Sequence, residues 1–91
     1  MCTGIVGQVV AGQVAGSALV AALECAGGAV QDAWSRAWQY VRASRIGGCT
    51  ELDEGALEYA EEVAQALGTD ADTDTGWQVV VAVLDAMDSL L

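Results

Sequence analysis

Apolar residues recur every three or four positions through the first half of the chain, which is the period of one face of a helix. This apolar side contains Ile5, Val9, Gly12, Gly16, Leu19, Val20, Leu23, Val30, Trp34, Trp38 and Val41. The pattern predicts a long helical segment over residues 4–46. Gly27–Gly28 lies near its middle, and two adjacent glycines predict a break or bend there.

A second amphipathic pattern follows and predicts a helix over residues 51–67. Its apolar face holds Leu52, Ala56, Tyr59, Ala60, Val63 and Leu67, opposite Glu51, Glu54, Glu58, Glu61, Glu62 and Gln65. Thr50 and Asp53 have the spacing of a capping box at its start. Gly68 is expected to end it, because glycine readily adopts the left-handed conformation that follows many helices.

The last helix is predicted over residues 76–90, with Asp74 or Thr75 as its N-cap. Most of its residues are apolar, so we expect this helix to be mostly buried. No segment shows a convincing strand pattern. We therefore expect an all-α fold, a small bundle of three to four helices in which residues 1–91 form a single helical domain.

The composition favours helices that pack closely and chains that associate. Of the 91 residues, 54% are hydrophobic, with no Phe and no Pro, and Ala, Val, Leu and Gly make up most of that fraction. A core of this size is only just large enough to fold alone. A homodimer would enlarge it. We expect the dimer interface at a small-residue stripe of the first helix, made by Gly12, Ala15, Gly16 and Ala22.

The charge is strongly negative and unevenly distributed. The net charge is −10, and residues 51–91 contain eleven acids and no base. Such a half repels nucleic acid and membrane phosphate and attracts a basic protein surface. The expected partner-binding residues are Glu51, Glu54, Glu58, Glu61, Glu62, Asp70, Asp72 and Asp74. Neighbouring carboxylates on one helical face lie about 5–6 Å apart, which is comparable to phosphate spacing along one nucleic-acid strand.

The three arginines, Arg36, Arg42 and Arg45, all lie in the first half, close to Trp34 and Trp38. Aromatic residues interleaved with arginines can bind nucleic acid. With a net charge of −10 that use is disfavoured. We expect both tryptophans in the core and the arginines paired with acids of the second half.

The opening letters MCTGIVG resemble the start of class II glutamine amidotransferases and of choloylglycine hydrolases. That resemblance implies Cys2 as an N-terminal nucleophile once the methionine is removed. It covers seven residues, and Thr3 interrupts the amidotransferase pattern. Both families are large sandwiches of sheet between helices, and this chain offers no partner residues. We therefore expect no catalytic activity and no catalytic residue.

Neither a metal site nor a cofactor is expected. Asp70, Asp72 and Asp74 alternate like the first ligands of a calcium loop, but Thr75 and Val81 stand where that loop needs Gly and Glu. The three cysteines, Cys2, Cys25 and Cys49, have no CxxC spacing. We expect them to be reduced thiols in a cytosol.

In size, helicity and acidity the chain resembles anti-CRISPR proteins, small phage-encoded inhibitors, several of which act as DNA mimics. This resemblance implies an inhibitor in the bacterial cytoplasm whose partner is a DNA-binding Cas subunit. Two alternatives stay open. One is a structural or adaptor protein of a phage or mobile element that assembles through its Gly/Ala-rich helix. The other is a small membrane-active protein with residues 5–23 inserted, because these nineteen residues are uncharged.

Overall fold

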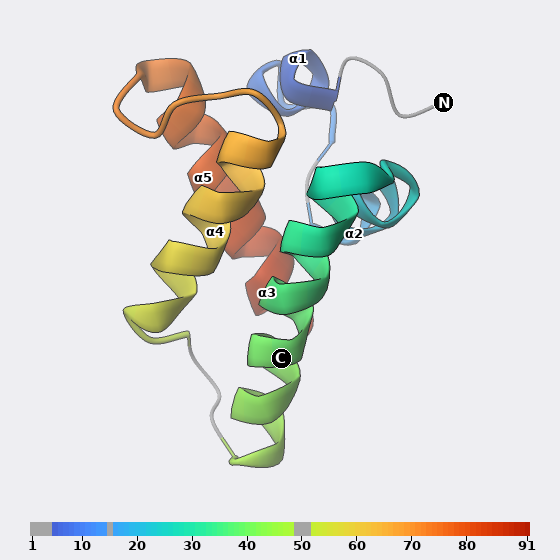
Figure 1. Cartoon of the computed structure of the whole chain (residues 1–91), viewed down its shortest axis with the longest axis vertical. Helices are drawn as coiled ribbons and strands as arrows, with labels where there is room; N and C mark the ends of the chain where they lie inside the picture. Colours follow the sequence, from blue (N-terminus) through green and yellow to red (C-terminus); the bar gives the residue numbers. More distant parts are fainter. Residues whose placement is uncertain (1–4, 15, 49–51) are drawn as a thin grey trace.

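A computed structural model describes residues 5–14, 16–48 and 52–91 of the chain. This part contains five helices and no strand, so the predicted all-α fold is confirmed (Figure 1). The helices are α1 (Ile5–Val10), α2 (Gly16–Cys25), α3 (Gly28–Ile46), α4 (Gly55–Ala66) and α5 (Asp74–Asp88).

The continuous helix expected over residues 4–46 is interrupted twice. The break at Gly27–Gly28 is confirmed, with φ values of 71° and 58° that favour glycine. The second break, after α1, was not expected, and the prediction of one helix is wrong there. Gly12 has φ 75° in this turn. The turn matters for packing, because it allows α1 and α2 each to lie against α5.

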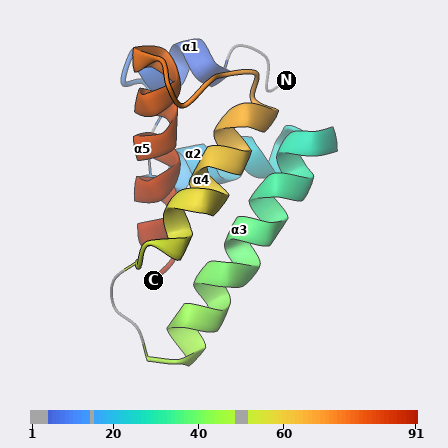
Figure 2. The ribbon, with the colours of Figure 1, turned by 60° about the vertical axis from the view of Figure 1, so that its left-hand side comes forward.

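Helix α5 is the centre of the bundle and packs against all four other helices (Figures 1 and 2). The other main contacts join α3 to α4 and α2 to α3. One cluster of buried apolar side chains fills the space between them. Its members are Val9, Leu19, Leu23, Ala33, Trp34, Ala37, Val41, Ala56, Ala60, Val63, Ala64, Val79, Val80, Val83, Ala86 and Met87.

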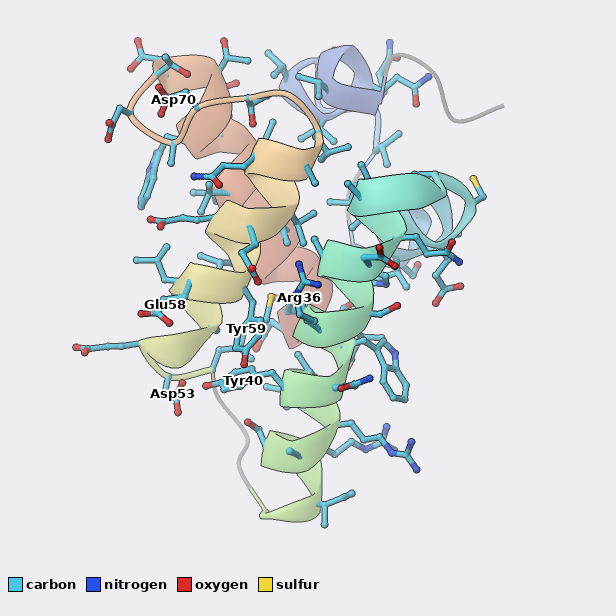
Figure 3. All side chains as sticks on the ribbon, viewed as in Figure 1. Arg36, Tyr40, Asp53, Glu58, Tyr59 and Asp70 are labelled. Carbon is cyan, nitrogen blue, oxygen red and sulfur yellow. The ribbon has the colours of Figure 1, made fainter. Side chains whose placement is uncertain are left out.

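Small side chains line the contact between α3 and α4. Ala37 of α3 is fully buried, as are Ala56 and Ala60 of α4. Small residues at a helix contact allow the two axes to approach closely. Two aromatic rings close one end of the contact: Tyr40 of α3 stacks on Tyr59 of α4 with ring centroids 4.9 Å apart (Figure 3).

Helix α4 begins later than the expected residue 51, and the prediction of a capping box there is not met. The Asp53 carboxylate accepts a hydrogen bond from the Gly55 backbone N–H at 2.9 Å, which forms a turn just before the helix. Thr50 lies outside the described residues. Gly68 follows the helix with φ 88°, as expected of a residue that ends one.

Helix α5 is capped by Thr73, so the prediction of Asp74 or Thr75 as N-cap is wrong. The Thr73 hydroxyl oxygen accepts from the Gly76 N–H at 3.0 Å and donates to the Asp70 carbonyl at 2.6 Å. The threonine satisfies a helix donor and a loop acceptor at once, which neither neighbour is placed to do.

Residues 5–23 do not form one membrane-length helix. They are divided between α1, a turn and α2. Within the described part of the chain, no helix combines the length and the apolar character that crossing a bilayer requires.

Gly76 is a position where we expect a methyl group to be costly. A Cβ there would overlap the backbone carbonyl of Asp70, and this backbone atom cannot move without shifting the loop. We expect Gly76→Ala to lower the free energy of unfolding by at least about 2 kcal/mol, measured by urea denaturation. Gly7→Ala in α1 is the control, because its Cβ would meet no atom within 4 Å. Equal effects of the two substitutions would contradict the close approach.

The Tyr40 hydroxyl is buried and has no hydrogen-bond partner among the described residues. A buried polar group without a partner loses its hydration and gains nothing in return. We expect Tyr40→Phe to raise the free energy of unfolding by about 0.5–1 kcal/mol, measured by thermal and urea denaturation. Tyr59→Phe removes the same atom from the other ring of the stack and should leave stability unchanged. A loss of stability in Tyr40→Phe would mean that the hydroxyl has a partner in solution.

Candidate functional site

Three glutamates form a row along the solvent side of α4. Glu54 immediately precedes the helix, and Glu58 and Glu61 follow at spacings of four and three residues, so the three share one face. Glu54 and Glu58 are exposed and Glu61 is half-buried. Glu58 points away from α3 (Figure 3). We call these three residues the acidic α4 face; the predicted contact residue Glu51 lies outside the described residues.

Glu62 differs from the three because it is paired. Its carboxylate lies 3.5 Å from the Arg36 guanidinium of α3, and both side chains are about half exposed. This is the ion pair that the structure shows among the described residues. The predicted pairing of arginines with second-half acids is therefore confirmed for Arg36. Glu62 serves the contact between α3 and α4 and is less available to a partner than the acidic α4 face.

The other two arginines leave the acidic α4 face uncompensated. Arg42 lies over the Trp38 ring, 5.6 Å from its centroid, and Arg45 lies one turn further along α3. In the described part of the chain neither is within 4.0 Å of a carboxylate. Trp34 is in the core as expected, whereas Trp38 is only half-buried.

Three exposed aspartates extend the negative charge past the far end of α4. Asp70 and Asp72 lie in the connection between α4 and α5, and Asp74 is the first residue of α5; we call these three residues the acidic loop. Figure 3 shows Asp70 near the top of the molecule and Asp53 beside the lower end of α4. The Asp70 carboxylate accepts from the Asp72 N–H at 3.0 Å, which fixes the turn. Among the described residues no group of three or more metal-ligating side chains gathers.

Trp77 and Val81 are exposed, which is an exception to the prediction that the last helix is mostly buried. Their exposed fractions are 48% and 41%. They are four residues apart, and Asp85 follows at the same spacing, so one exposed row of α5 combines apolar and acidic side chains. The two aspartates in this row, Asp85 and Asp88, were the sequence signal that could have indicated an outer face. An exposed tryptophan is a frequent anchor of protein interfaces.

The three described residues of the expected dimer interface, Gly12, Gly16 and Ala22, do not share a helical face. Gly12 lies exposed in the turn after α1, and Gly16 is the first residue of α2. Ala22 is half-buried and packs against the core of its own chain. Ala15 lies outside the described residues. The prediction that these residues lie on one continuous helix is therefore wrong, and a dimer interface at them stays a prediction.

Of the three cysteines, only Cys25 belongs to the described part of the chain. Cys25, at the end of α2, is disulfide-bonded, so the prediction of a reduced thiol is wrong for this residue. Cys2, the residue in the position of an N-terminal nucleophile, and Cys49 lie outside the described residues.

No protein-family model, curated protein or solved structure matches this chain.

Trp77 and Trp34 should differ in their contribution to stability. Trp34 is 2% exposed and Trp77 48%. We expect Trp34→Ala to lower the free energy of unfolding by about 3–5 kcal/mol and Trp77→Ala by less than about 1.5 kcal/mol, in urea denaturation of the pure protein. A large loss in Trp77→Ala would show that this side chain is covered in solution, for example by a second copy of the chain.

Proposed function

We propose that this chain is a non-enzymatic, acidic protein-binding module that inhibits a nucleic-acid-binding protein complex. In this proposal its carboxylates occupy a basic groove in place of phosphates. One observation carries the proposal: the acidic α4 face and the acidic loop are largely exposed, and the described part of the chain places no basic side chain against them.

This arrangement of acidic side chains lowers the stability of the isolated chain. Glu54, Glu58 and Glu62 follow one another at four-residue spacing, and like charges at this spacing destabilise a helix. Arg36 relieves Glu62 only. A basic partner would relieve the remaining repulsion, so the same charges that weaken the free protein would favour the complex.

The geometry suits a groove that binds a phosphate backbone. From Glu54 to Glu61 the helix rises about 10 Å and carries three carboxylates at roughly regular intervals. Because α4 is packed on both α3 and α5, this row is held on a rigid element. A partner therefore meets preformed charge rather than a flexible acidic tail.

Charge mainly steers association and sets specificity, and a buried apolar anchor supplies much of the affinity in many interfaces. Trp77 and Val81 provide such an anchor on α5, the helix that packs beside α4. Their neighbours Asp85 and Asp88 keep this row acidic as well. The proposed contact thus combines acids of α4 and the loop with an apolar centre on α5.

In the most specific form of this proposal, the partner is a Cas subunit that binds DNA in a bacterial cell, and the chain is a phage-encoded inhibitor. The alternative is an adaptor of a phage or mobile element that assembles through small residues. The two are separated by the effect of DNA: duplex DNA competes with a mimic for its groove, whereas it leaves an adaptor contact intact.

The test compares two charge reversals of equal size. Glu54→Lys with Glu58→Lys changes the acidic α4 face, and Glu24→Lys with Asp32→Lys makes the same change of four charge units on exposed residues of α2 and α3. Each immobilised protein is exposed to bacterial lysate, and retained proteins are eluted with duplex DNA and identified by mass spectrometry. We expect the first pair to reduce capture of DNA-eluted proteins at least tenfold, about 1.4 kcal/mol, and the second to leave it within about twofold.

Circular dichroism must show that both variants are folded. Capture should also fall steeply between low and moderate salt, since contacts between exposed charges are screened. Equal capture by the two variants, or a retained protein that neither DNA nor salt releases, would refute mimicry. The second result would support the adaptor.

A further inference from the structure

A groove of about 550 Å³ lies along the C-terminal half of α3, away from the acidic α4 face. Its lining residues are Trp38, Val41, Arg42, Arg45, Ile46 and Leu90. The last turns of α3 extend beyond the other helices in both ribbon views (Figures 1 and 2). The volume is within the range of about 300–1,000 Å³ that is usual for small-molecule sites.

The apolar part of this groove is incompletely covered by the protein. Val41 is buried beneath it, Trp38 and Leu90 are half-buried, and Ile46 is 77% exposed. Ile46 is the most exposed large hydrophobic side chain in the described part of the chain. An apolar body placed here would remove this surface from water, which is favourable by about 25 cal/mol per Å².

The charged part consists of Arg42 and Arg45, which form no ion pair with a carboxylate of the described residues. Arg42 and Arg45 are three residues apart, on neighbouring positions of α3. Arg36 on the same helix contacts Glu62, whereas no described carboxylate comes within 4.0 Å of Arg42 or Arg45. The contact of Arg42 with the Trp38 ring holds its guanidinium beside the groove. Guanidinium groups bind carboxylate, sulfonate and phosphate oxygens well.

A second groove of about 370 Å³ continues from the first and shares Trp38 and Arg42 with it. Glu24 lines this second groove, so an anion is disfavoured at that end. Arg45 lines the first groove only. The charges therefore favour an orientation with the anionic group near Arg42 and Arg45.

We propose that this groove binds a small anionic amphiphile, a molecule with an apolar body and one carboxylate, sulfonate or phosphate group. The apolar body contacts Trp38, Ile46 and Leu90, and the anion lies on Arg42 and Arg45. A chain with a net charge of −10 repels anions over most of its surface, so anion binding requires such a local basic site. This inference is independent of the proposed inhibition.

The test uses two fluorescent probes with the same apolar body. 8-Anilinonaphthalene-1-sulfonate carries a sulfonate, and N-phenyl-1-naphthylamine lacks it. We expect Arg42→Gln with Arg45→Gln to weaken sulfonate-probe binding at least about tenfold and Arg45→Gln alone about threefold, because charge-assisted hydrogen bonds are lost. Both variants should bind the uncharged probe within about twofold of the native chain. Arg36→Gln is the matched control, since it removes one positive charge from α3 outside both grooves.

The position of the probe is read from the three tryptophan indole N–H signals in nitrogen-15 correlation spectra. We expect the Trp38 signal to shift on addition of the sulfonate probe. The Trp77 signal should stay in place, because thirteen residues of helix and turn, about 20 Å, separate Trp77 from Leu90.

Three outcomes would overturn the proposal. The native protein does not bind the sulfonate probe at millimolar concentration, or Arg36→Gln weakens binding as much as Arg45→Gln does, or the Trp77 signal shifts while the Trp38 signal does not. The last outcome would assign the probe to the exposed row of α5.

Discussion

The buried side of α5 is the surface on which the rest of the molecule is assembled. Val79, Val80, Val83, Ala86 and Met87 are all fully buried, and four other helices contact α5 to cover them. A helix with so wide an apolar arc cannot be covered by one neighbour. The two glycine breaks in the first half of the chain serve this requirement, since they divide one long helix into pieces that reach different parts of α5.

This packing also determines on which surfaces the charged side chains lie. Helix α4 buries Ala56, Ala60, Val63 and Ala64 between α3 and α5, so its glutamates must face water. All three arginines lie on α3, and only Arg36 is close enough to α4 to form a pair. The molecule therefore has an acidic surface on α4 and the adjoining loop, and a small basic groove at the end of α3. The two surfaces have opposite charge because different halves of the sequence build them.

The two proposals concern these two surfaces and depend on different physical effects. On α4 the relevant quantity is repulsion among exposed carboxylates that the fold does not neutralise. At the end of α3 it is the combination of an exposed apolar side chain, Ile46, with two arginines that have no described carboxylate within 4.0 Å. The Arg36–Glu62 pair differs from both surfaces, because there an arginine and a carboxylate of the same protein neutralise each other.

The sequence by itself determined the all-helical character of the chain, the break at Gly27–Gly28, the polar side of α4 and the burial of Trp34. These follow from helical period and from the conformational freedom of glycine, which are local properties. Only the tertiary structure decided that Trp77 and Val81 are exposed, that Gly12 and Gly16 lie on no common helix face, and that Glu62 is paired. It also made Thr73 rather than Asp74 the N-cap of α5. Periodicity gives the angle between two side chains around a helix axis. It does not say which side of the helix a neighbouring helix will cover. Which side is covered depends on how all five helices share one small core.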